Sequence, residues 1–277
     1  MDRRAAVAGS WYPDTAAELR RALDAHLAAV GERTDGNDSE NAELVGLMAP
    51  HAGLMYSGDV AAHAYRLLRG RHIDVVVLVG PSHYVAFEGV SVWPRGAFES
   101  PLGRLLVDEQ LVDEMLASQS LVHDRPSAHA REHSLELQLP FVAHLAPAAR
   151  ILPLVMGKQT RATAYALADA LARVLTNRRA LLVASSDLSH FYDAARASEL
   201  DASVLREIDR FDADGLMRLL ERRPDHACGG GPLVSVLEAS RALGASRSEV
   251  LRYADSGDVS GDKSSVVGYM SAALWRD

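Results

Sequence analysis

Asp74–Val79 (DVVVLV) is the stretch of sequence that decides the fold. A short, uninterrupted run of β-branched and aliphatic residues is typical of a strand that is buried on both faces, as in a parallel sheet. Similar runs recur at Leu44–Ala49 (LVGLMA), Ile151–Met156 (ILPLVM) and Ala180–Ala184 (ALLVA), with longer segments of helical spacing between them. This alternation predicts an α/β fold with a central, mostly parallel (mixed) sheet between helix layers.

Helical segments fill the intervals between these strands. The first, Thr15–Val30, has Thr15 as a candidate N-cap and leucines at helical spacing on one face. Further helices are expected at residues 60–68, 131–145 with an interruption at Pro140, 163–175, 195–208, 216–220 and 232–243, the last of which starts with Pro232 in its first turn.

The remaining segments complete one domain. Gly31–Asn41 (GERTDGNDSEN) is polar and has nothing to bury, so it is expected to be an exposed loop. Near the end of the chain, Val250–Ala254 and Val266–Ala273 are predicted strands that pair across Ser256–Ser265. Because no internal repeat or low-complexity linker divides the sequence, we expect a single domain over residues 1–277.

Composition and charge exclude several classes of partner. The chain has a formal net charge of −8 and no run of Lys or Arg longer than a pair, so it lacks the basic surface that binds nucleic acid. The apolar run Val75–Val79 is far shorter than the roughly 20 residues that cross a bilayer. Met1–Gly9 contains no apolar stretch of signal-peptide length. We therefore expect a cytoplasmic protein without a nucleic-acid or membrane partner; the sequence leaves its oligomeric state open.

Three of the predicted strands end in polar turns that contain histidine. These turns are MAPHAG with His51, GPSH with His83 and SSDLSH with His190. Ligands of open α/β sheets bind beyond the carboxyl ends of the strands, so parallel strands would bring the three turns to one edge. Neutral imidazole is a common ligand of transition metals. Asp187, three residues before His190, is placed to accept the imidazole N–H, which favours His190 as a general base rather than a ligand.

Cys228 in HACGGGP (His226–Pro232) is the only cysteine, which excludes an intramolecular disulfide. It precedes a predicted helix N-terminus, where free N–H groups and the helix dipole would lower the thiol pKa and favour thiolate. Gly229 and Gly230 would let the backbone approach a ligand closely. The alternative is a small buried hydrophobic residue without a chemical role.

Two other segments contain candidate ligand-binding residues. His133 lies in EHSLE (Glu132–Glu136), although an acidic first turn is also ordinary helix capping. Trp11 and Tyr12 precede a turn near the N-terminus, where they would either wall a ligand pocket or anchor the core.

Seven motifs in this order together resemble the Memo family, whose prokaryotic members are called AmmeMemoRadiSam system protein B. They are WYP, PHAG, GPSH, EHSLELQLPF, SSDLSH, ACGGGP and SGDVSGD followed by VVGY, and they span nearly the whole chain. The family is similar in fold to the class III extradiol ring-cleaving dioxygenases, which are non-haem iron enzymes with a central sheet between helix layers.

The resemblance implies roles for individual residues. His51 and His83 match two metal-binding histidines, Cys228 matches the site cysteine of the family, and Asp187 and His190 match the remaining polar residues of the pocket. In the dioxygenases, His190 would correspond in place to a catalytic acid–base histidine. Those enzymes complete their iron site with a carboxylate, whereas this chain has Cys228, a softer ligand that shifts preference toward Cu(I) or Zn(II).

Three functional hypotheses follow. The first is a metal-dependent oxidoreductase with Fe(II), or alternatively Cu or Zn, because the Memo family is associated with iron or copper binding and redox activity. The second is a metal-free enzyme in which Cys228 attacks, His190 is its base and Asp187 orients the base. The third is a binding module for an anionic peptide or small ligand, since animal members of the family recognise phosphorylated peptides and helix N-termini hold anions.

Overall fold

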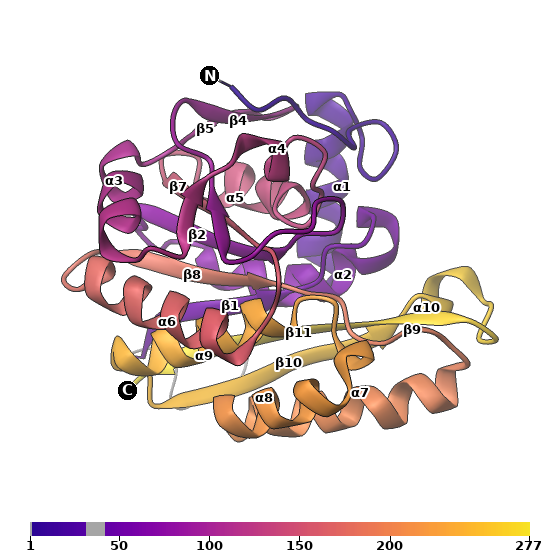
Figure 1. Ribbon diagram of the computed structural model, residues 1–277. Helices are drawn as coiled ribbons and strands as arrows, with labels where there is room; N and C mark the ends of the chain where they lie inside the picture. The colour runs from indigo at the N-terminus through magenta and orange to yellow at the C-terminus, as the bar shows by residue number, and fades with distance from the viewer. Residues whose placement is uncertain (1, 32–41) are drawn as a thin grey trace.

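A nine-stranded sheet runs through the centre of the molecule (Figure 1). The structure is a computed structural model that describes residues 2–31 and 42–277, so nearly all of the predicted loop Gly31–Asn41 lies outside the described residues. The strand order is β10-β11-β1-β8-β2-β7-β3-β6, and β9 pairs with β11. The strands are β1 (Glu43–Ala49), β2 (Val75–Pro81), β3 (Val90–Val92), β6 (Val122–Asp124), β7 (Arg150–Met156), β8 (Ala180–Ser185), β9 (His190–Tyr192), β10 (Arg247–Asp255) and β11 (Val266–Arg276).

The centre of this sheet is parallel, as the apolar runs predict. Strands β1, β8, β2 and β7 are parallel neighbours, and Val77 of β2 lies between Leu152 of β7 and Leu182 of β8. Every residue of β2 is buried. These strands are apolar throughout because helices cover both faces of the sheet.

The flanks of the sheet are antiparallel. The C-terminal strands β10 and β11 pair with each other as predicted, and β11 also pairs with β1 and β9. At the other end, β3 is antiparallel to β7 and parallel to β6. The short strands β3, β6 and β9, and the separate hairpin of β4 (Ala97–Ser100) and β5 (Gly103–Leu106), are absent from the sequence prediction. The prediction of a mixed sheet between helix layers is confirmed.

Helices form a layer on each face of the sheet (Figure 1). On one face α2 packs on the strands, with α1 and α5 against it; on the other, α9 packs on the strands with α6 and α8 beside it, and α7 packs on β10 and β11. Thr15 caps α1 by accepting from the Glu18 N–H, as predicted. The helices are α1 (Ala16–Ala29), α2 (Leu54–Tyr65), α3 (Glu109–Ser118), α4 (Pro126–His129), α5 (Leu139–Leu145), α6 (Arg161–Leu175), α7 (Ala194–Asp209), α8 (Ala213–Arg222), α9 (Gly230–Ala242) and α10 (Gly257–Ser260).

The predicted helix Arg131–Leu145 is wrong in its first half. Turns and a short 3₁₀ segment, η2 (Glu136–Gln138), precede α5, and Pro140 lies in the first turn of α5 instead of interrupting a longer helix. The Glu132 carboxylate accepts from the Ser134 N–H at 2.9 Å, and the Ser134 hydroxyl donates to the Pro81 carbonyl at 2.9 Å. These side chains bond to backbone groups, which competes with helix formation.

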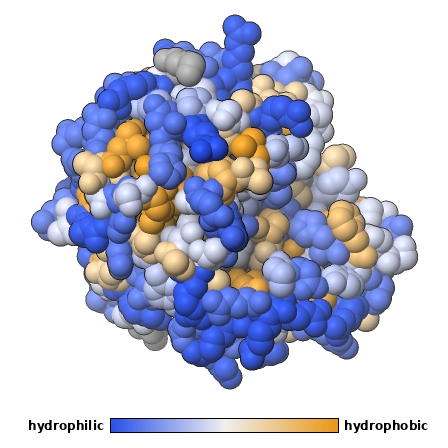
Figure 2. Space-filling model, viewed as in Figure 1, coloured by the Kyte–Doolittle hydropathy of each residue, from blue (hydrophilic) through white to orange (hydrophobic). Residues whose placement is uncertain are grey.

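The surface is largely hydrophilic where helices face solvent. Figure 2 shows this over α7 and α8, along the lower part of the view. Among the residues described, no helix is long and apolar enough to span a membrane.

Candidate metal centre

His51 follows β1 after Pro50 and is almost fully buried. Its backbone N–H donates to Asp187 Oδ1 at 2.7 Å, and its ring Nδ1 lies 2.9 Å from Ser185 Oγ. Burial, followed by the proximity of His83, lowers the pKa of His51 to about 3. The ring is therefore neutral at pH 7, which is the form that binds metal ions.

The hydrogen bonds of Ser185 determine which nitrogen of His51 carries the proton. Ser185 Oγ donates its only hydrogen to the Ser134 carbonyl oxygen at 2.6 Å and accepts from Gln138 Nε2 at 2.8 Å. Only an accepting lone pair remains for His51, so His51 Nδ1 must be the donor in this contact. The other ring nitrogen, Nε2, then has a free lone pair for a ligand.

His83, just after β2, is held by the buried carboxylate of Glu132. Glu132 Oε2 accepts from the His83 backbone N–H at 2.6 Å, and Glu132 Oε1 lies 2.8 Å from His83 Nδ1. Burial opposes ionisation of Glu132, but the hydrogen bonds that it accepts from His83 and from the Ser134 N–H outweigh burial and lower its pKa to about 2. An ionised carboxylate only accepts, so His83 Nδ1 carries a hydrogen and Nε2 is the nitrogen left for a ligand.

Cys228 lies between the short helix η3 (Pro224–His226) and α9, and its sulfur is 3.2 Å from His51 Nε2. The Asp187 backbone N–H donates to the sulfur at 3.3 Å. The prediction of a lowered thiol pKa at this position is wrong: burial, followed by the nearby Asp187 carboxyl, raises the pKa of the Cys228 thiol. Without a cation beside it, this group is therefore a neutral thiol at pH 7.

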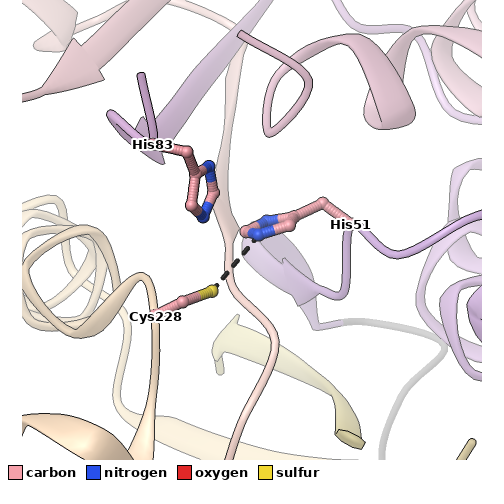
Figure 3. A group of neighbouring side chains, drawn as sticks. All are labelled: His51, His83 and Cys228. Atoms are coloured by element: carbon pink, nitrogen blue, oxygen red, sulfur yellow. Dashed lines mark hydrogen bonds between the residues drawn. The ribbon is translucent and has the colours of Figure 1, made fainter. Parts of the chain in front are cut away.

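The two imidazoles and the sulfur converge on one point. One ligand atom from each of His51, His83 and Cys228 lies within 4.8 Å of the others. Figure 3 shows the two rings and the sulfur directed toward a common space, with the His51–Cys228 contact dashed. In a second group, the ligand atoms of His83, Glu132 and His133 also lie within 4.8 Å of one another, so the two groups share His83. The strand ends that were expected to share an edge thus bring His51 and His83 together, and Cys228, which lies just before α9, completes the group.

A cleft of about 600 Å³ opens onto the two histidines. The polar and titratable residues that line it include His51, His83, His133, Asp187 and His190. The other lining residues are Ser10, Trp11, Ala52, Gly53, Met55, Tyr56, Phe191, Ser256, Ser260, Asp262, Ser265, Val267 and Tyr269. A cleft of this size with convergent polar groups is typical of a small-molecule site.

A family model described as Memo-like protein matches residues 3–273. The chain belongs to the Memo family. It is 38% identical over 98% of its length to a MEMO1 family protein of Methanobrevibacter smithii, of which the match covers 99%. It is 41% identical over 96% of its length to a MEMO1 family protein of Methanosarcina mazei, of which 97% is covered. Among solved structures, the uncharacterized protein JW3007 from Escherichia coli K12 is similar with a TM-score of 0.48 and 14% identity, over 82% of this chain and 99% of that one.

Two of the aromatic residues predicted to bind a ligand line the cleft of this Memo-family chain. The His133 ring stacks on the His83 ring with centroids 4.5 Å apart. The Trp11 and His133 ring centroids are 4.4 Å apart. Burial, followed by the proximity of His51, lowers the pKa of His133 to about 4. Trp11 and His133 therefore form a neutral aromatic wall next to the two candidate ligands.

Asp187 and His190 lie in the same cleft, but the predicted carboxylate–imidazole hydrogen bond is wrong. Asp187 Oδ1 instead accepts from the His51 backbone N–H, and no hydrogen bond to the His190 ring occurs among the described residues. Burial raises the pKa of Asp187. Asp187 therefore orients the turn that contains His51, whereas His190 faces the cleft from the start of β9.

Tyr12 is a core residue instead of a wall of the pocket. It is buried, and its hydroxyl donates to Glu136 Oε1 at 2.7 Å. Of the two readings of this aromatic pair, the core anchor is correct for Tyr12 and the pocket wall for Trp11.

Gly229 and Gly230 do not line the cleft either. The Gly229 N–H donates to Ser186 Oγ at 2.9 Å, and a Cβ at Gly229 would lie 2.4 Å from the Ser185 carbonyl oxygen. A Cβ at Gly230 would meet the Leu220 side chain at 2.7 Å. The glycines allow close packing of α9 against its neighbours, which brings Cys228 to the histidines.

Sequence reasoning did not assign a role to the residues that orient the two imidazoles. These residues are Glu132, Ser134, Gln138 and Ser185. A usable signal was present in EHSLELQLP, where polar residues recur within a segment that is otherwise apolar and fully buried. Buried polar side chains require partners, so this pattern indicates a hydrogen-bond network.

Proposed function

We propose that this Memo-family protein is a metal-dependent oxidoreductase in which His51, His83 and Cys228 hold one iron or copper ion. The observation that carries the proposal is the convergence of one ring nitrogen from each of His51 and His83 and the Cys228 sulfur within 4.8 Å of one another. Hydrogen bonds to Ser185 and Glu132 place the proton of each ring on Nδ1, away from that point. Such partners behind metal-binding histidines fix the tautomer and raise the basicity of the ligand nitrogen.

The donor set fits a redox-active transition metal. Fe(II) is our first choice because imidazoles with open positions suit iron, and Cu or Zn are the alternatives because thiolate is a soft ligand. The raised pKa of Cys228 is compatible with this proposal, since a cation beside the sulfur would stabilise the thiolate that burial disfavours. When bound, the ion would supply electron transfer and polarisation of a substrate group.

The side chains around the ion would bind the substrate and transfer protons. Trp11 and His133 provide a flat surface beside the candidate ligands. His190 faces the same cleft from another strand end, where its imidazole is placed to accept or donate a proton at the substrate. Asp187 would act as a positioning residue, because its carboxyl group accepts from the His51 backbone N–H.

Two observations weaken the metal-free alternatives. Burial raises the pKa of Cys228, which disfavours the thiolate of a nucleophilic enzyme, and the neighbour of the sulfur is His51 Nε2 at 3.2 Å, whereas that hypothesis named His190 as the base. At the start of α9, the Gly229 and Gly231 N–H groups donate to Ser186 and Gln159, so they are occupied instead of free for an anion.

Metal quantification after anaerobic reconstitution with Fe(II) or Cu(I) tests the proposal. The parent should bind about one ion per chain, and His51→Ala and Cys228→Ser should each lower the affinity by at least about tenfold. His72→Ala is the matched control, because His72 is an exposed histidine paired with Asp74. Retention of the parent's metal content and absorption spectrum by both ligand variants would show that the assignment is wrong.

A further inference from the structure

The cleft exposes large apolar side chains to solvent. Met55 is 65% exposed, Tyr56 39% and Phe191 78%, and all three line the cleft. Met55 and Tyr56 belong to the first turn of α2, which directly follows the turn that contains His51, whereas Phe191 belongs to β9. Two separate elements thus expose apolar surface in the same cleft, and exposed apolar surface of this kind is typical of a ligand-binding site.

Phe191 is held in this position by its backbone. Its φ is +65°, a conformation that is unfavourable for a bulky residue. The residues on both sides are fixed by pairing of β9 with β11, in which His190 lies opposite Val267 and Tyr192 opposite Val266. The surrounding structure therefore imposes the strained conformation, and its result is an aromatic ring presented at the mouth of the cleft.

The cleft has acidic but no basic side chains of lysine or arginine among the described residues that line it. Asp262, an exposed residue of the lining, has its pKa lowered by hydrogen bonds from the Ser264 hydroxyl and backbone N–H, so its carboxylate is ionised at pH 7. An anionic group distant from the candidate ligands would find no cationic partner and would face a carboxylate.

We propose that the cleft takes a small molecule with a flat, apolar, uncharged or cationic body, which packs between Met55, Tyr56 and Phe191. The part of this inference that places the polar end of the molecule at His51 and His83 rests on the proposed function. The volume of about 600 Å³ suits a molecule of this kind, and the apolar surface that it would bury against the cleft supplies the affinity. Selectivity against anions comes from Asp262 and the missing basic side chains.

Three naphthalene probes that differ in charge test the inference: 2-naphthol, 2-naphthylmethylamine as its ammonium ion, and 2-naphthoate. Binding is measured by calorimetry at pH 7 with the full chain, both metal-free and after reconstitution. The metal-free chain should bind the neutral and cationic probes at least about tenfold more tightly than naphthoate. Phe191→Ala should weaken the binding of naphthol by about tenfold, because the ring that covers the ligand is removed.

Leu106→Ala is the matched control, since Leu106 is a 43% exposed apolar residue on β5 that does not line the cleft. It should bind all three probes as the parent does. Phe191→Ala should retain the parent's metal content, which shows that the fold and the candidate ligands are intact. The inference is overturned if no probe binds, if naphthoate binds as tightly as naphthol, or if the two variants weaken binding equally. A parent that fails to bind metal but ranks the probes as expected refutes the proposed function and leaves this inference standing.

Discussion

Ser185 is the residue on which the orientation of His51 depends, although it does not face the cleft itself. Gln138 is fixed in turn, because the Tyr65 hydroxyl donates to its Oε1 at 2.8 Å and its Nε2 donates to the Pro50 carbonyl at 2.9 Å. Each polar hydrogen in this buried network has one acceptor. The network of Tyr65, Gln138 and Ser185 thus determines which nitrogen of His51 is protonated.

Replacement of Ser185 by alanine should disturb this arrangement. In Ser185→Ala, the His51 Nδ1 hydrogen and one Gln138 hydrogen lose their acceptor, so both tautomers of His51 become accessible. We expect metal affinity to fall by about 10–100-fold and the free energy of unfolding by about 1–3 kcal/mol. Nitrogen-15 NMR of the histidine rings and metal titration check the two effects.

Ser91→Ala provides the control for that experiment. Ser91 is also buried and donates to a backbone carbonyl, that of Arg125, but it does not contact the candidate ligands. It should lower stability without a change in metal affinity. Equal metal affinities in the two serine variants would contradict the assigned role of Ser185.

At the scale of elements, α4 carries a buried histidine into the core. His129 is 1% exposed, its Nε2 bonds to the Ser91 carbonyl on β3 at 3.2 Å, and its ring lies edge-on to Trp93 and Phe98. Its Nδ1 has no hydrogen-bond partner in the described part of the chain. Burial, followed by the charge of Arg3, lowers the pKa of His129 from 6.5 to about 3.

This histidine should make stability depend on pH. Between pH 6.5 and 3 the unfolded chain binds a proton at residue 129 that the folded chain does not, so the free energy of unfolding falls as the pH falls. From pH 6.5 to 5.0 the loss from this one group is roughly 2 kcal/mol. Urea unfolding at pH 7.5 and 5.0 measures the effect. The decrease in the free energy of unfolding between these pH values should be smaller in His129→Gln than in the parent, by roughly 2 kcal/mol. His72→Gln, which alters an exposed histidine, should behave as the parent does.

The sequence predicted the parallel centre of the sheet because each of its strands is a short apolar run between helical segments. It failed in residues 90–124, where the strands β3 and β6 have only three residues each and carry no clear alternation. It also predicted that His51 and His83 meet, because strand ends share an edge, whereas the place of Cys228 beside them was implied by the family resemblance. The partners of Glu132 and Ser185 were beyond prediction, since hydrogen bonds between residues about 50 positions apart depend on the completed fold.

For the whole molecule, a buried ion pair joins the N-terminal segment to the rest of the chain. The Arg3 guanidinium bonds to Glu136 Oε2 at 2.5 Å, and both side chains are buried. Glu136 also accepts from the backbone N–H groups of Ala6 and Val7 and from the Tyr12 hydroxyl. One carboxylate therefore holds the segment that ends in Trp11, a wall of the cleft.

Removal of this carboxylate should destabilise the whole protein. Glu136→Gln leaves the Arg3 charge buried without its counterion, so we expect the free energy of unfolding to fall by about 3–5 kcal/mol. Tyr12→Phe removes only one of the hydrogen bonds to Glu136 and should cost about 1 kcal/mol. Urea unfolding monitored by circular dichroism compares them, and equal losses in the two variants would show that the ion pair adds nothing.

The order of the candidate ligands along the chain has a consequence for biosynthesis. Cys228 is 177 residues after His51, so the sulfur leaves the ribosome on the order of ten seconds after the first imidazole. Strand β11, which pairs with β1 immediately before His51, is synthesised later still. Until Cys228 is synthesised, a nascent chain has only the two imidazoles of the proposed three-ligand site, so that site can be completed only late in synthesis.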